Sequence, residues 1–248
     1  MKKFSSYFFT ILLSGIVCIR FAYAGPADYV YTPTVEYSEK EIDFKRGSAR
    51  QRDDTLVQVT SLGFGYGATE YWFTELYLKR ETVGSDGLTI AEWENKFQLT
   101  ETGRFPVDFG VIIELEAPLN NTNVPYESRL GPLFQSEFGK LQLNGNLLFA
   151  RKFARGTGPY VTEFGYQLQA KYRWKPAFEF GVQGMGETGE WNSWDNQSSQ
   201  NHRAGPAAFG KIPLGNRQAI KYNAAWLLGA SNAAPSHTFR MQVEYEFF

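Results

Sequence analysis

The amino-acid sequence predicts an all-β fold, a transmembrane antiparallel up-and-down β-barrel of 12 strands. Three observations lead to this prediction. Apolar and polar residues alternate over many stretches of about ten residues, the connections between these stretches alternate in length, and no stretch of useful length follows the period of a helix. Alternation with a period of two gives each strand two different faces, and in a membrane barrel one face meets lipid while the other meets the lumen.

The individual strands are identified by this alternation and by the turn residues between them. They are expected at residues 35–45, 56–68, 70–81, 88–100, 107–117, 129–138, 141–152, 160–174, 177–187, 203–214, 218–229 and 238–248. The first alternates imperfectly, and a bulge near Glu39 would bring Tyr37 into phase with Ile42 and Phe44. The second contains LGFGYG at residues 62–67, where glycine on the inner face makes room or lets the barrel wall bend.

The connections between the strands predict the orientation of the barrel. Those after every second strand are short, whereas the others are longer and polar, and the longest is GEWNSWDNQSSQNH at residues 189–202. Membrane barrels have short periplasmic turns and longer extracellular loops. We therefore expect the short turns and both chain ends in the periplasm.

The chain ends on a strongly alternating stretch, TFRMQVEYEFF at residues 238–248. It resembles the C-terminal signal strand of bacterial outer-membrane barrels, which ends on Phe and is read by the barrel assembly machinery. Phe247 is in phase with the apolar face, and Phe248 is one residue beyond it. The alternative for such a stretch is an edge strand of a periplasmic β-sandwich.

The first 24 residues are expected to form a secretory signal peptide. Two lysines precede an apolar run at residues 8–19, and a small-x-small site predicts cleavage after Ala24. The only cysteine, Cys18, lies inside this segment, so the mature chain would have no thiol chemistry. The expected organisation is a signal peptide at 1–24, a short periplasmic N-terminal segment at 25–34 and the barrel at 35–248.

Composition narrows the classes of function. The chain has 25 basic and 26 acidic residues, which is no basic footprint for nucleic acid. Mean hydropathy is −0.36, which argues against a helical membrane domain but not against a barrel, since only alternate residues of a barrel strand face lipid. Aromatic residues make up 17% of the chain, in keeping with aromatic girdles at the two membrane interfaces.

Several segments also carry a resemblance to a known family. WFTELYLKRE, AEWENKFQLTE, PVDFGVIIELE and GPLFQSEFG, with others in the range 29–248, are similar to a family of uncharacterised proteobacterial outer-membrane proteins. The resemblance implies the barrel fold and a place in the outer membrane of a Gram-negative cell. It carries over no functional residues.

Polar faces of the expected strands supply candidate pore-lining residues. The acids lie on the third to sixth strands and the bases on the eighth to twelfth, so the two sets would form roughly opposite walls. The candidates are Glu75, Glu92, Glu94, Asp108, Glu114, Glu116, Glu137, Lys171, Arg173, Lys211, Lys221 and Arg240. Charges that face a lumen set ion selectivity. In the alternative interpretation they pair across a narrow barrel and fill it. Lys171, Arg173, Lys221 and Arg240 are expected to compensate Glu92, Glu94, Glu114 and Glu116 in either case.

No catalytic, cofactor or metal site is predicted. The two histidines, His202 and His237, lie near expected extracellular loops and match no Ser-His-Asn or Asp-His arrangement, although they could approach each other as metal ligands. Trp191 and Trp194 stand beside amide side chains in the longest loop. They could bind a sugar or anchor the loop at the lipid headgroups.

The sequence therefore predicts an outer-membrane channel or pore for small polar or ionic solutes, and no enzyme. The alternatives are a plugged structural or adhesion barrel without transport and a surface-exposed enzyme. Expected partners are outer-membrane lipid and lipopolysaccharide, the barrel assembly machinery and a small polar solute, without nucleic acid.

The orientation can be checked with proteases added to intact cells. Cleavage is expected only in the longer loops, above all within residues 189–202, because these would lie outside the cell. Mass spectrometry of the released peptides locates the cuts. Cuts confined to the turns at Gly139-Lys140 and Lys175-Pro176 would contradict the orientation.

Overall fold

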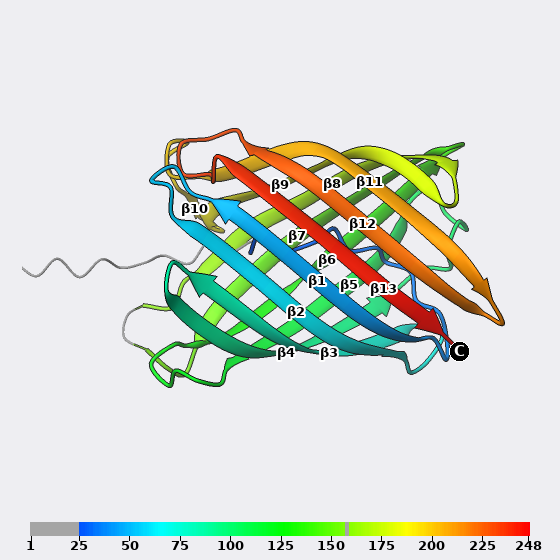
Figure 1. Cartoon of the computed structure of the whole chain (residues 1–248), viewed down its shortest axis with the longest axis horizontal. Helices are drawn as coiled ribbons and strands as arrows, with labels where there is room; N and C mark the ends of the chain where they lie inside the picture. The colour runs from blue at the N-terminus through cyan, green and yellow to red at the C-terminus, as the bar shows by residue number, and fades with distance from the viewer. Residues whose placement is uncertain (1–24, 157–158) are drawn as a thin grey trace, which may run out of the picture.

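Twelve antiparallel strands close into a barrel in this computed structural model, which describes residues 25–156 and 159–248 (Figure 1). The strands are β1 (Lys40–Arg50), β2 (Leu56–Gly67), β3 (Trp72–Val83), β4 (Asp86–Gln98), β5 (Asp108–Pro118), β6 (Tyr126–Phe138), β7 (Leu141–Phe153), β8 (Thr162–Lys175), β9 (Phe178–Glu190), β11 (Asn201–Gly215), β12 (Gln218–Gly229) and β13 (His237–Phe247). A two-residue strand, β10 (Ser193–Trp194), pairs with β9. The predicted 12-stranded barrel is confirmed, while the expected signal peptide lies outside the described residues.

Closure of the barrel joins the first strand to the last. β13 pairs with β1 from Lys40↔Phe247 to Arg50↔His237, and with β12 on its other side. β8 pairs with β9, and β9 with β11, so the ring has no free edge. A closed ring satisfies every strand's backbone hydrogen bonds internally, which hydrocarbon requires.

The first strand begins later than the alternation predicted. β1 starts at Lys40 rather than at residue 35, and Tyr37 and Glu39 precede it. Ser38 has a φ of 63°, which turns the chain immediately before the strand. The proposed bulge near Glu39 is therefore wrong, because this stretch is a turn and does not belong to the sheet.

The barrel has two ends, which differ in the connections that they carry (Figure 1). The turn end carries the C-terminus and the β2–β3, β4–β5, β6–β7, β8–β9 and β11–β12 connections; the loop end carries the others. Two connections break the predicted alternation of lengths. β3 and β4 are joined by a tight hairpin around Gly84, whose φ is 58°, and the nine-residue connection 99–107 lies at the turn end. Residues 86–87, expected in a loop, are already paired in this hairpin.

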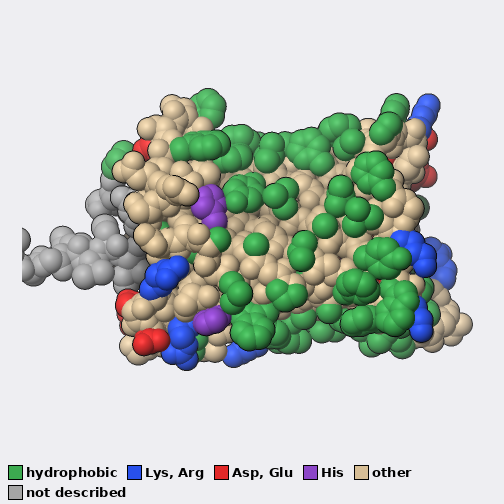
Figure 2. Space-filling model, turned by 90° about the horizontal axis from the view of Figure 1, so that it is seen from above, with side chains coloured by type: hydrophobic (Ala, Val, Ile, Leu, Met, Phe, Trp, Pro, Cys, Tyr) green, Lys and Arg blue, Asp and Glu red, His purple; other side chains and the backbone are tan. Residues whose placement is uncertain are grey.

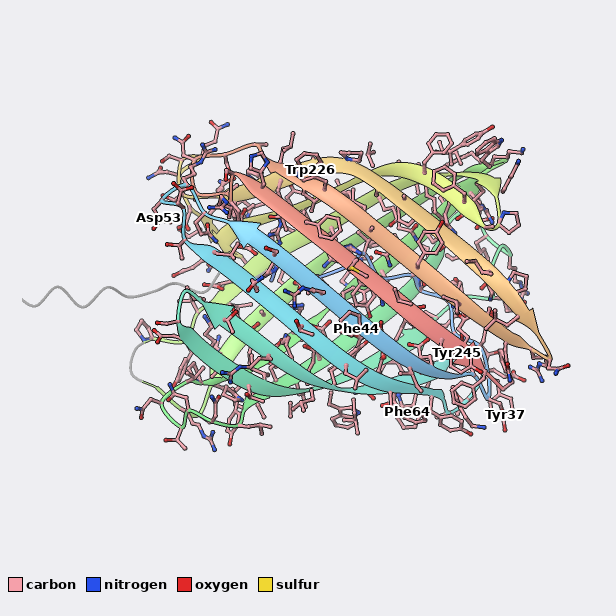
Figure 3. All side chains as sticks on the ribbon, viewed as in Figure 1. Tyr37, Phe44, Asp53, Phe64, Trp226 and Tyr245 are labelled. Atoms are coloured by element: carbon pink, nitrogen blue, oxygen red, sulfur yellow. The ribbon has the colours of Figure 1, made fainter. Side chains whose placement is uncertain are left out.

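The outer wall is apolar, and the inner wall carries the buried charged and amide side chains. Leu62, Leu76 and Trp226 are 57%, 65% and 56% exposed, while Asp43 and Arg240 on the inner face are 0% and 1% exposed. Figure 2 shows hydrophobic side chains spread along the outside between two polar ends, and Figure 3 shows Phe44, Phe64 and Trp226 pointing away from the barrel. Among the described residues, no helix is long and apolar enough to cross a membrane.

Arginine placed at Val111 or Ile113 tests the outward face. Ile113 is 40% exposed on β5, and a charge there should lower the free energy of unfolding from lipid vesicles by about 2–4 kcal/mol. Urea titration followed by tryptophan fluorescence measures the loss. The matched control is arginine at Leu119, which is 58% exposed in the β5–β6 connection and should cost about 0–1 kcal/mol. Equal stability of all three variants would contradict the assigned face.

Candidate functional site

A segment of the chain itself runs through the lumen. We call residues 25–39 the luminal segment; Figure 1 shows its trace inside the ring of strands. The carbonyl of Gly25 accepts a hydrogen bond from Arg203 Nη2 (3.2 Å), near the loop end of β11. The amide of Val35 donates to Gln98 Oε1 (2.7 Å), at the turn end of β4. Residues 25–34 were expected to lie in the periplasm, and the structure instead places them along the barrel axis.

Apolar side chains of the inner wall hold the luminal segment. Val30 packs in a buried cluster with Met185, Ala207, Phe209, Ala225 and Leu227, on β9, β11 and β12. Tyr31 packs in a second cluster with Ile112, Leu133 and Leu148, on β5, β6 and β7. Because neighbouring residues of an extended chain point in opposite directions, the segment contacts two opposite walls at once. These strands carry apolar residues at inward positions because the luminal segment packs against them.

Glycines on the inner wall make room for the backbone of the luminal segment. A Cβ atom on Gly47 would lie 2.1 Å from the carbonyl of Pro26, and one on Gly67 would lie 2.0 Å from the carbonyl of Glu36. Both distances are far below van der Waals contact. Any other residue at these positions would displace the segment, so the wall is shaped to its path.

Acidic candidates of β4 and β5 are compensated locally. Lys79 Nζ contacts Glu92 (2.7 Å) and also Glu116. Arg129 Nη1 lies 2.9 Å from Glu114, which also accepts a hydrogen bond from the Tyr31 hydroxyl. Each of these cations lies on a strand next to that of its acid, except that one strand separates Lys79 from Glu116. Side chains beside the acids, and not bases from the opposite wall, therefore supply the positive charge.

The luminal segment completes this group of charges. Asp28 lies 3.5 Å from Arg129, and the Tyr29 hydroxyl donates to both oxygens of Glu94 (3.0 and 3.1 Å). The segment thus interacts with the wall through charges and hydrogen bonds as well as through apolar packing.

The four bases that were expected to compensate these acids have other partners, so that expectation is wrong. Lys171 pairs with Glu179 (3.0 Å) and Arg173 with Glu137. Lys221 contacts Glu39 (3.5 Å) and Glu246, and Lys211 also reaches Glu246 (2.9 Å). Glu39, Glu41 and Glu246 place their carboxylate oxygens within 4.8 Å of one another, and the two lysine ammonium groups contact Glu39 and Glu246 of this cluster.

Arg240, the fourth of these bases, donates to both arms of a belt of hydrogen-bonded side chains on the inner wall. Its Nη1 donates to Gln183 Oε1 (3.0 Å), Gln183 donates to Gln169 (2.6 Å), and the chain continues through Asn144 to Gln135. Its Nη2 donates to Asn223, and Asn223 donates to Gln242 (2.7 Å), which donates to Asp43 (2.8 Å). The sequence pattern did not indicate this belt, although its amides all occupy the inward positions of their strands.

Two chambers lie inside the barrel, on either side of the middle of the luminal segment. The loop-end chamber has a volume of about 460 Å³, and its lining includes Lys79, Glu92, Glu116, Arg129 and Lys152. The turn-end chamber has a volume of about 810 Å³. Tyr29 and Tyr31 line both chambers. The luminal segment is therefore the partition between them.

Ten of the 12 candidate pore-lining residues line a chamber. Glu92 and Glu116 face the loop-end chamber. The turn-end chamber is lined by Glu75, Glu94, Glu137, Lys171, Arg173, Lys211, Lys221 and Arg240. The other two face neither: Asp108 accepts a hydrogen bond from the amide of Gly103 (2.9 Å) in the β4–β5 connection, and Glu114 is covered by Tyr31.

The histidines and loop tryptophans lie away from these chambers. His202 hydrogen-bonds through its ring to Tyr166 (3.0 Å) and Gln200 (2.7 Å), and His237 packs against Trp226. Trp194 stacks on Phe164 with an interplanar angle of 4°. This packing on an aromatic residue of the outer wall favours the anchoring role of the loop over sugar binding.

Comparison with known proteins finds the same fold at low sequence identity. No protein-family model matches the chain, and no curated protein is similar to it in sequence. The NanC porin is 10% identical with a TM-score of 0.55, over 84% of this chain and 99% of the porin. An outer membrane channel from Pseudomonas putida F1 is 15% identical with a TM-score of 0.56, over 90% and 99%. The translocator domain of the autotransporter NalP from Neisseria meningitidis is 11% identical with a TM-score of 0.52, over 86% and 89%. The fold is thus that of bacterial outer-membrane barrels.

Replacement of Lys79 by methionine tests the local charge compensation. Glu92 and Glu116 would lose the cation they share, so the free energy of unfolding should fall by about 3–5 kcal/mol, measured by urea titration in vesicles. The matched control is Lys96→Met. Lys96 Nζ lies 5.1 Å from the ring centroid of Phe73, and no carboxylate of the described residues lies within 4.0 Å of it. Equal losses in the two variants would contradict the pairing.

Proposed function

We propose that the protein is an outer-membrane channel for small polar or ionic solutes, closed in this state by its own luminal segment. One observation carries the proposal: two chambers with charged lining residues lie one toward each end of the barrel, and Tyr29 and Tyr31 of the luminal segment line both of them. A barrel that served only as a scaffold has no need of chambers at both ends of a thin partition. Displacement of one short segment would join them into a continuous path.

The proposed location rests on the outer wall and on the two ends of the sequence. The wall is apolar, as a surface in contact with lipid must be. Export would use the signal peptide cleaved after Ala24, and the assembly machinery would read β13. The loop end would then face the cell exterior.

The lining of the chambers supports the proposed class of solute. The turn-end chamber has acids such as Glu75 and Glu94 together with bases such as Lys171, Lys221 and Arg240. Paired charges and amides around a solute favour polar and charged molecules over apolar ones. Volumes of about 460 and 810 Å³ are those of pockets for small molecules and exclude a folded macromolecule.

A plugged barrel without transport is the second candidate, and the packing of the luminal segment favours it. Val30 and Tyr31 are 6% and 4% exposed, as in a protein core. The two candidates differ in what happens when the segment loses its docking side chains: a channel opens, whereas a structural barrel loses stability without conducting.

Single-channel recording in planar bilayers separates the candidates. The variant replaces residues 25–34 by a glycine-serine stretch of equal length, which removes the side chains that dock on the wall. We expect long-lived open events from this variant and rare ones from the wild type. The matched control places the same stretch at residues 191–200, between β9 and β11, and should behave as the wild type. A variant that folds but never conducts would support the plugged barrel, and a wild type that conducts as continuously as the variant would show that the segment does not close the path.

A further inference from the structure

A row of arginine and threonine side chains crosses the outer face of the first four strands. Arg46, Thr60, Arg80 and Thr89 are successive cross-strand partners on β1, β2, β3 and β4. Arg46 Nη1 donates to Thr60 Oγ1 (2.9 Å), and Arg80 Nη1 donates to Thr89 Oγ1 (2.8 Å). We call these four residues the arginine row. Both guanidinium groups are held against the barrel wall by a neighbouring strand.

On β1, β2 and β3, the arginine row lies where the apolar band of the outer wall ends. The next outward row toward the turn end contains Phe44, Leu62 and Leu78, which are 37%, 57% and 58% exposed. Figure 3 shows Phe44 pointing away from the barrel. The next outward row toward the loop end is polar and contains Ser48, Gln58 and Thr82. In a bilayer, a border between such rows lies at the level of the lipid headgroups.

The two arginines of the row are exposed and have no acidic partner. Within the part of the chain that the structure describes, no carboxylate oxygen lies within 4.0 Å of either guanidinium group. The nearby Arg50 differs, because it pairs with Asp54 (3.6 Å). A guanidinium group has five N–H donors, so one hydrogen bond to a threonine leaves most of them available.

The wall also provides space for one of these groups. A Cβ atom on Gly87 would lie 2.0 Å from Arg80 Nη2, so only glycine allows the guanidinium group to rest there. The same arrangement recurs on another strand pair, where Arg151 Nη1 donates to Thr162 Oγ1 (3.2 Å). Arginines that donate to a threonine of the neighbouring strand therefore occur at two places near the loop end.

We propose that Arg46 and Arg80 bind the phosphate groups of a phosphorylated lipid headgroup in the membrane leaflet at the loop end. Arginine presents a planar fork of donors that matches phosphate, and such charge-assisted hydrogen bonds are the strong ones. The two arginines are two strands apart, which separates their backbones by roughly 10 Å along the sheet. This spacing suits a headgroup with two phosphates. The proposal needs the barrel to lie in a bilayer, but it does not need the lumen to conduct.

Lipid binding in detergent micelles tests the proposal, with diphosphoryl lipid A as the probe and native mass spectrometry as the readout. The variant is Arg46→Gln with Arg80→Gln, and we expect its affinity for the probe to fall about tenfold or more. The matched control is Arg50→Gln with Arg104→Gln. It removes the same charge from two arginines that already have carboxylate partners, Asp54 and Glu101, and should bind as the wild type does.

Three further measurements keep the result interpretable. Arg46→Lys with Arg80→Lys retains the charge and should keep more affinity than the glutamine variant, which also shows that these positions tolerate substitution. Dephosphorylated lipid A should bind wild type and glutamine variant equally weakly, and inorganic phosphate should bind far more weakly than the phosphorylated lipid. The proposal is overturned if the control loses as much affinity as the glutamine variant, if the wild type retains the dephosphorylated lipid as tightly, or if inorganic phosphate binds as tightly as the lipid.

Discussion

Hydrogen bonds that Arg240 donates join polar side chains of the inner wall into one belt. The Arg240 side chain is 1% exposed in the middle of the inner wall, and a buried charge without partners costs several kcal/mol. One arm of its belt crosses β9, β8, β7 and β6; the other passes through Asn223 and Gln242 to Asp43, where Tyr77 and Lys45 also converge. The belt therefore joins strands from both halves of the sequence. Each amide accepts a hydrogen bond from one neighbour and donates to the next, so the buried positive charge of Arg240 polarises the whole chain of hydrogen bonds.

The luminal segment turns a hollow barrel into two chambers. Its contacts are of two kinds, apolar packing of Val30 and Tyr31 and hydrogen bonds from tyrosine hydroxyls to Glu94 and Glu114. Apolar docking stabilises the closed arrangement, since release would expose Ile112 and Leu133 to water in the lumen. If the proposed channel exists, this packing makes the closed arrangement its default state. Opening would require a partner, a solute or a field that offsets the loss of this packing.

The outer wall and the inner wall differ in how their cations are paired. Inside the barrel, cations such as Lys79 and Arg240 have an acidic or amide partner close by. Outside, Arg46 and Arg80 are held by threonines and keep their charge unpaired at the edge of the apolar band. Unpaired arginines are tolerated only where an anion or water can reach them. The loop-end border therefore differs from the rest of the lipid-facing surface in the ligand that it can accept.

The sequence by itself determined the strands, their two faces and the barrel. Alternation with a period of two is a local property, and about ten residues of a strand are enough to recognise it. The structure places ten of the 12 candidate residues on chamber walls, and their role in a pore stays a prediction. The sequence could not show that Lys79 lies between Glu92 and Glu116, since that contact depends on the register of three strands. Nor could it show that residues 25–39 enter the barrel. The docking of Tyr31 on Glu114 joins residues 83 positions apart, and the apolar Ile112, Leu133 and Leu148 mark no local pattern until closure brings them to one side of the lumen. Only the tertiary structure decided these contacts, because strand register and barrel closure, which fix them, are properties of the whole ring.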